Sequence, residues 1–151
     1  MRYQKLDTTG DTTYVLVFET GEAVMEKLAA FVAKEGIVSA RFHGIGAFSE
    51  AGLRFFNTDH LEYIDIPVHE QVELLSLTGT IASRDGKAQL HAHAILGKPD
   101  GQCIGGHLKD AVVRPTLEVM VIASPAHLHR EFDPRVELPL LQLDASKQQE
   151  V

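Results

Sequence analysis

Several features are scarce or absent in this chain, and each absence excludes a class of protein. The 151 residues include a single cysteine, Cys103, which excludes an internal disulfide and a zinc site built on cysteine pairs. No apolar run approaches the roughly 20 residues that cross a membrane as a helix. The first residues also lack the apolar stretch of a signal peptide. We therefore expect a cytoplasmic protein with no membrane partner.

Positive charge is also scarce. The sequence has 14 Lys and Arg against 21 Asp and Glu, which gives a net charge of −7 when histidines are neutral. Proteins that bind DNA unaided normally concentrate basic residues on one surface and have a high pI. Because the pI is about 5.5 and the basic residues are scattered, DNA binding by this chain alone is not expected.

Common catalytic motifs are missing as well. The sequence has no GxSxG elbow, no GxxxxGK[ST] loop and no HExxH pair. Gly44-Ile45-Gly46 is not a dinucleotide fingerprint, because no helix is predicted after it. We interpret these glycines as a place of close backbone packing at the end of a strand.

The composition is that of an ordinary globular domain, with 44% hydrophobic and 23% charged residues. A chain of this length fits one domain with a sizeable core. We predict a single domain over residues 1–143, followed by a polar C-terminal tail over residues 144–151.

One segment has a clear helical pattern. Lys34 falls in its last turn, and Gly36 stands where a glycine commonly ends a helix. The pattern predicts an α-helix over about residues 21–35. Its apolar residues recur on one helical face, at Val24, Met25, Leu28, Phe31 and Val32.

The remaining signals are those of strands, short runs rich in β-branched and aromatic residues and separated by turn residues. We expect the α+β class, a mostly antiparallel β-sheet packed with one principal α-helix. Turns are predicted at residues 85–86 and 99–101, and an extended connector at residues 134–139. The predicted strands are 14–18, 37–48, 51–57, 63–67, 71–83, 88–96, 103–113 and 117–123.

Three histidines come together in this predicted sheet. His91 and His93 are two positions apart on one strand, so their side chains share a face, with Cα atoms about 7 Å apart. His107 lies on the next strand. If the turn is centred on Asp100, paired positions sum to 200 and His93 faces His107, whereas a sum of 198 places His91 there. A sum of 199 would turn His107 to the other face, so the prediction depends on register.

Three imidazoles on one face fit a metal site with an open position, as in catalytic zinc sites. We expect His91, His93 and His107 to bind a divalent transition metal, zinc before nickel or iron. The alternative is that they are surface or hydrogen-bonded histidines without a metal. A second H-x-H pair, His127 and His129, is assigned to a polar loop or an exposed strand.

Glu118 and Arg41 are weaker candidates for a catalytic role. Glu118 lies in a strand among apolar residues, where an unpaired carboxylate would be costly to bury. We expect it to pair with Arg41, with Arg114, or with the outer nitrogen of a metal-bound histidine. The sequence alone identifies no catalytic residue.

Several blocks, in order, resemble the plants-and-prokaryotes-conserved (PPC) domain, which in plants follows AT-hook motifs. The blocks span roughly residues 5–125 and are residues 20–22, 40–47, 72–79, 91–97, 105–108 and 115–119. The resemblance implies an α+β fold, a homotrimer, and the metal site of stand-alone prokaryotic members at His91, His93 and His107. The chain lacks the Arg-Gly-Arg-Pro core of an AT-hook, so the transcriptional role of plant members is not carried over.

Three functions are left open. The first is a metal-binding protein, which includes a metal-dependent enzyme acting on a small polar or anionic molecule. The second is a DNA-associated regulator like the plant members. The third is a structural or interaction module whose trimer is the functional unit. The sequence does not decide whether the chain is an enzyme.

Overall fold

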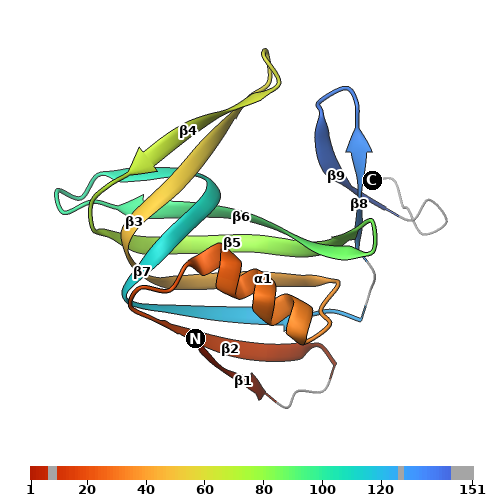
Figure 1. The fold of residues 1–151 in the computed structure, drawn as a ribbon, viewed down its shortest axis with the longest axis horizontal. Helices are drawn as coiled ribbons and strands as arrows, with labels where there is room; N and C mark the ends of the chain where they lie inside the picture. The colour runs from red at the N-terminus through yellow and green to blue at the C-terminus, as the bar shows by residue number, and fades with distance from the viewer. Residues whose placement is uncertain (7–9, 126–127, 144–151) are drawn as a thin grey trace.

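The structure is a computed structural model that describes residues 1–6, 10–125 and 128–143. Nine strands form one sheet, and the single helix of the described residues lies against it (Figure 1). The elements in chain order are β1 (Arg2–Leu6), β2 (Thr12–Glu19), α1 (Val24–Lys34), β3 (Ala40–Asn57), β4 (Glu62–Val68), β5 (Val72–Arg84), β6 (Lys87–Gly97), β7 (Cys103–Ala123), β8 (His129–Asp133) and β9 (Leu138–Gln142). The predicted α+β class is therefore confirmed.

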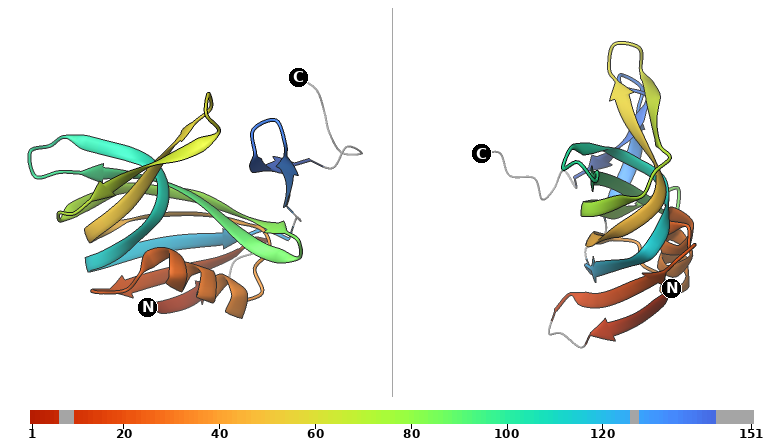
Figure 2. Two further views of the ribbon diagram at one scale, coloured as in Figure 1. Left: turned by 45° about the horizontal axis from the view of Figure 1, so that its top comes forward. Right: turned by 90° about the vertical axis from the view of Figure 1, so that its left-hand side faces the viewer.

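The centre of the sheet is a closed circuit of strands. β3 pairs with β5 and β7, and β6 also pairs with β5 and β7, all antiparallel. β2 and β1 extend the sheet beyond β7, and β4 pairs with the second half of β3. The β3–β4 hairpin projects from the body of the sheet, as two further views show (Figure 2). The circuit curls the sheet around the core and brings the start of β7 against β6.

Four of the predicted strands correspond to only two strands in the structure. Residues 37–48 and 51–57 were predicted separately, but residues 40–57 form β3; residues 103–113 and 117–123 together lie in β7. The apparent breaks are register shifts, one of them between Gly46 and Phe48 where β3 faces the Arg114–Thr116 segment. A bulge bends a strand without ending it, so polar residues and a proline need not mark a boundary.

The prediction for residues 134–139 is wrong. This segment is the turn and the start of β9 in a hairpin in which Phe132 pairs with Pro139. Proline weakens the signal of a strand, yet it is tolerated at a sheet edge, where its missing N–H is not needed. The predicted tail over residues 144–151 lies outside the described residues, and the domain boundary at residue 143 stays a prediction.

Helix α1 covers one side of the curled sheet and completes the core. It begins three residues later than predicted, because Ala23 is still extended and forms an isolated bridge with Val112. Gly36 ends the helix with φ +64°, as its position predicts. The buried helical residues are Val24, Leu28, Phe31 and Val32. Burying a side chain of this size stabilises the fold by about 1.5–3 kcal/mol.

Among the described residues, no helix has the length and apolar character that crossing a membrane requires.

Candidate metal centre

The turn between β6 and β7 fixes the register of the histidines. Gly101 adopts φ +82°, and its N–H donates to the carbonyl of Lys98 at 2.9 Å. The Lys98 N–H donates to the carbonyl of Gln102 at 2.8 Å, which centres the turn on Asp100. His93 therefore pairs with His107, the register in which paired positions sum to 200. The predicted cluster of three histidines required a register of this kind, and the structure has it.

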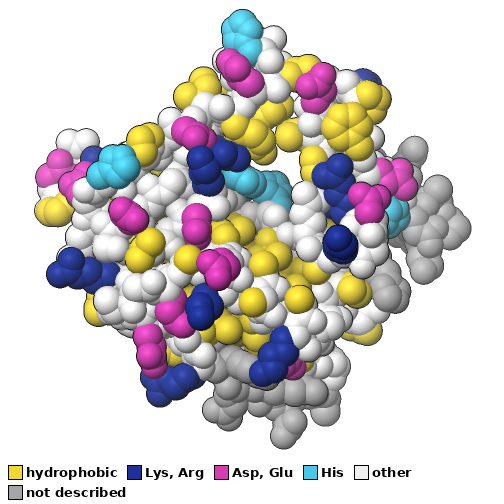
Figure 3. Space-filling model, in the orientation of Figure 1, with side chains coloured by type: hydrophobic (Ala, Val, Ile, Leu, Met, Phe, Trp, Pro, Cys, Tyr) yellow, Lys and Arg dark blue, Asp and Glu magenta, His cyan; other side chains and the backbone are white. Residues whose placement is uncertain are grey.

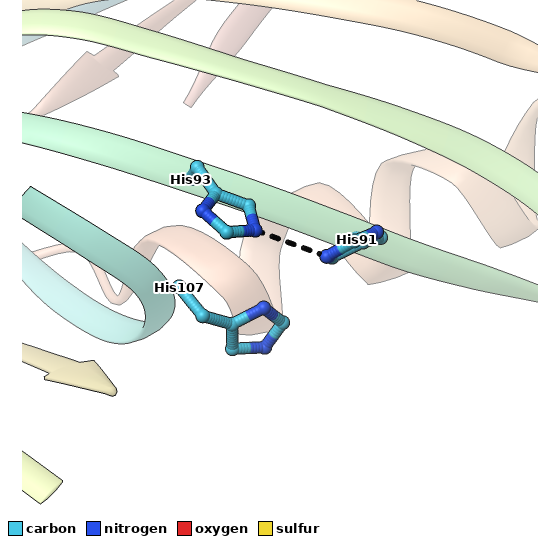
Figure 4. Close-up of side chains that lie close together, drawn as sticks. All are labelled: His91, His93 and His107. Atoms are coloured by element: carbon cyan, nitrogen blue, oxygen red, sulfur yellow. Dashed lines mark hydrogen bonds between the residues drawn. The ribbon is translucent and has the colours of Figure 1, made fainter. Parts of the chain in front are cut away.

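The three imidazoles converge on one point. His91 and His93 project from the same face of β6 toward His107 on β7 (Figure 4). The Nε2 atoms of His91 and His93 are 3.2 Å apart, and one ring nitrogen from each of the three residues lies within 4.8 Å of the others. Two nitrogens that each bind one tetrahedral metal at about 2.0–2.1 Å lie roughly 3.3 Å apart. The spacing therefore suits three ligands of a single ion.

Burial favours the neutral form of the rings. Desolvation, followed by the neighbouring histidines His91 and His93 and the charge of Arg54, lowers the pKa of His107 to about 4. Desolvation, followed by the charge of Arg130 and by His93, lowers the pKa of His91. A metal binds the neutral imidazole, so both ligands are in the required form at neutral pH.

One ring nitrogen also lacks a partner. His107 Nδ1 is buried and has no hydrogen-bond partner among the described residues. An unsatisfied buried polar atom costs about 1–3 kcal/mol, and a bound ion would remove that cost. The donor set, three imidazoles with no thiolate, is one that zinc, copper, nickel and iron accept. The residues present therefore fit a first-row transition metal.

The histidines lie at the base of a hollow. Histidine side chains are visible between the projecting β3–β4 hairpin and the β8–β9 hairpin (Figure 3). The β4 residue Tyr63 contacts the ring of His107, with centroids 5.3 Å apart, and the Arg54 guanidinium lies 5.5 Å from the centre of the Tyr63 ring. A cavity of about 320 Å³ continues from His91 and His107 toward β8 and β9. This volume is at the lower end of small-molecule sites.

A buried arginine forms the far side of the cavity. Arg130 is 8% exposed, and its Nη2 donates to Thr80 Oγ1 at 2.9 Å. Thr80 pairs with His91 across β5 and β6, so the guanidinium lies beside the histidines. The sequence prediction missed Arg130, whose signal was an arginine that directly follows an H-x-H pair. It also missed Tyr63, which no motif marks.

The structure does not bring the weaker candidates to the histidines. Glu118 is exposed in the second half of β7, so it has no need of the partner that burial would demand. Arg41 is exposed and borders a different cavity, near Ser39 and Ile122. Neither is among the described residues that line the two cavities at the histidine cluster.

Predictions were also made for the second H-x-H pair and for the glycines at residues 44 and 46. His129 is an exposed residue of β8, as expected for a polar strand position, and His127 lies outside the described residues. Close packing at Gly44 and Gly46 is confirmed, because a Cβ on either would overlap the backbone of β7. The glycines lie within β3, however, and not at a strand end.

A β-rich α+β domain with three clustered imidazoles on one sheet face defines the class of this protein. A family model, the Plants and Prokaryotes Conserved (PCC) domain, matches residues 6–125. The chain belongs to this family, as the sequence blocks suggested. Among curated proteins, no significant match is found.

Solved structures show the same fold over nearly the whole chain. A candidate DNA-binding protein from Bacteroides thetaiotaomicron is 30% identical, with a TM-score of 0.86 over 93% of this chain and 96% of that one. A candidate DNA-binding protein from Ralstonia eutropha is 32% identical, with a TM-score of 0.84 over 94% and 96%. A protein from Archaeoglobus fulgidus, named as metal-containing, is 29% identical, with a TM-score of 0.81 over 95% and 99%.

Proposed function

We propose that this chain is a metal-binding protein in which His91, His93 and His107 hold one divalent transition metal, with zinc the first expectation. The observation that carries the proposal is the convergence of three ring nitrogens within 4.8 Å at the base of a cavity. The relative from Archaeoglobus fulgidus, named as metal-containing, supports it. Three protein ligands leave a position for water or a small molecule, and a bound metal would lower the pKa of such a water. If the protein is an enzyme, its activity would be a metal-dependent reaction on a small molecule.

Metal content tests this function. The protein is purified without an affinity tag, and its metals are measured by mass spectrometry. The parent is expected to hold close to one metal per chain, and the His91→Ala, His93→Ala double variant almost none. The matched control is His60→Ala, His69→Ala, which removes two exposed histidines elsewhere. If the double variant at the cluster holds as much metal as the parent, the site is wrong.

DNA association is the second candidate, because two relatives with about the same fold are named as candidate DNA-binding proteins. The net charge of −7 opposes it, since most of the affinity of a protein for DNA comes from contacts between basic residues and phosphates. A mobility-shift titration at ~100 mM salt decides between the two functions. Binding at micromolar or lower concentration would favour DNA association, and no shift would leave metal binding as the function.

A homotrimer is the proposed assembly. Its support is a set of exposed apolar side chains on neighbouring strands, Ile45 on β3, Leu75 on β5 and Ile95 on β6, which are 60%, 51% and 48% exposed. Apolar residues clustered on a surface commonly mark a protein interface. If metal removal leaves the trimer intact and lowers only its melting temperature, the metal is structural rather than catalytic. The expected cytoplasmic location stays a prediction, and cell fractionation tests it.

A further inference from the structure

The cavity beside the histidines has an unusual charge for this protein. Its described lining includes two arginines, Arg84 and Arg130, together with His91 and His107, and contains no Asp or Glu. The chain as a whole has seven more acidic than basic residues. A cavity lined by positive and neutral groups in an acidic protein is a local exception that favours an anion.

Arg130 is held in place but not neutralised. Its Nη1 donates to the carbonyl of Pro139 at 3.3 Å and its Nη2 to Thr80 Oγ1 at 2.9 Å, both uncharged acceptors. Its Nε is buried and has no partner among the described residues. A buried guanidinium without a carboxylate is costly, since its charge loses hydration and gains no counter-ion. A fixed cation without a counter-ion among the described residues thus borders the cavity.

Two neighbouring groups continue the polar surface. Gln89, two residues before His91 on β6, has a buried Oε1 that also lacks a partner among the described residues. Arg84 is 38% exposed, and its ion pair with Asp85 is 3.7 Å long, with Asp85 itself 90% exposed. An exposed ion pair of this length contributes little to stability, so Arg84 can bind an anion in the cavity instead. The apolar residues 138–140 form the other wall.

We infer that this cavity binds a small anionic molecule, whose carboxylate or phosphate is held by the guanidinium groups of Arg130 and Arg84 while its remaining polar atoms face the three histidines. The inference deepens the proposed function and rests on it, because it names the class of molecule that would approach the metal. The cavity of about 320 Å³ limits the ligand to a small metabolite-sized compound.

Calorimetric titration of zinc-loaded protein tests the inference with matched probes. Lactate and glycerol phosphate carry the two anionic groups, and lactamide and glycerol are their neutral counterparts. The anions are expected to bind at least tenfold more tightly than the neutral probes, and the better of the two anions identifies the group that the site prefers. Arg130→Gln is expected to weaken the anion by about tenfold or more, as the loss of a charged hydrogen bond does.

Two further variants keep the result interpretable. Arg135→Gln removes the same charge from the same hairpin, but Arg135 pairs with Asp133 outside the cavity, so anion binding should match the parent. Because Arg130 also holds Thr80 and Pro139, its variant could lose structure. In that case Arg84→Gln decides, with an expected loss of about threefold or more.

Metal content is measured before any probe is added, which separates the two failures. If zinc binds but the charged and neutral probes bind alike, the anion site is refuted and the metal site stands. Anion affinity unchanged by both Arg84→Gln and a folded Arg130→Gln also refutes it. If the parent binds no metal, the proposed function fails, and the same titrations on metal-free protein decide the anion site alone.

Discussion

The close approach of β3 and β7 at Gly46 predicts a large effect of a single methyl group. In Gly46→Ala, the new Cβ would overlap the carbonyl oxygen of Thr116 and lie 2.7 Å from Leu117 Cα. Ordinary contacts between carbon atoms begin at about 3.5 Å, and backbone atoms cannot rotate away as a flexible side chain can. The two strands must therefore separate where Gly46 pairs with Leu117. Overpacking of this kind costs about 1–3 kcal/mol, and we expect about 3 kcal/mol here.

Urea unfolding followed by circular dichroism measures this cost. The transition midpoint should fall without a change in its slope, and the melting temperature should drop by about 6–12 °C for a domain of this size. Gly52→Ala is the matched control on the same strand, because its Cβ would lie 3.6 Å from Lys109, an ordinary contact. The control should be neutral or stabilising by up to about 1 kcal/mol. Equal stabilities for the two variants would refute the close approach of the strands.

Three further predictions concern the metal, pH and assembly. A chelator should lower the melting temperature of metal-loaded parent by about 5 °C or more, as saturating ligand linkage implies, and leave that of His93→Ala unchanged. In metal-free protein the pKa of His107 is about 4, below that of the unfolded chain, so the unfolded state takes up a proton first as pH falls. The contribution of neutral His107 to the free energy of unfolding is therefore fully present above about pH 6.5 and is lost progressively as the pH falls to about 4. Urea melts across this pH range should show a smaller decline in the free energy of unfolding for His107→Phe than for the parent. Light scattering should report a trimer for the parent and smaller species for Ile45→Arg, whose position is 60% exposed; a monomeric parent would remove the proposed assembly.

The elements that were predicted well are those in which local pattern and burial agree. The helix has one apolar face that the core buries, and Gly36 has the positive φ that its position required. The β6–β7 turn was predictable because Asp100 and Gly101 satisfy the turn with their own side chain and backbone. Since that turn sets the register, it also set the geometry of the histidine cluster.

The elements that were predicted poorly depend on contacts between distant segments. The continuity of β3 through residues 49–50 is invisible locally, because the bulges there exist only in the presence of β7. The β8–β9 hairpin carries prolines that weaken its signal, and β8 joins the sheet through one parallel pair, Ser83 with His129. Arg130 was missed for the same reason. Its side chain is buried only because β8 lies beside β5, a contact between segments that are far apart in the sequence.

The three histidines and the buried arginine of the cavity lie on different parts of the sheet. The three histidines lie on β6 and β7, within the matched family region at residues 6–125, and each strand is paired on both sides near them. Arg130 lies beyond that region, on a hairpin at the edge of the sheet. Changes in the hairpin can therefore alter the cavity without moving any of the three histidines. The proposed metal ligands all lie on β6 and β7, whereas the proposed anion site combines Arg84 of the matched region with Arg130 of the β8–β9 hairpin, and the Arg130→Gln and His93→Ala variants should separate the two properties.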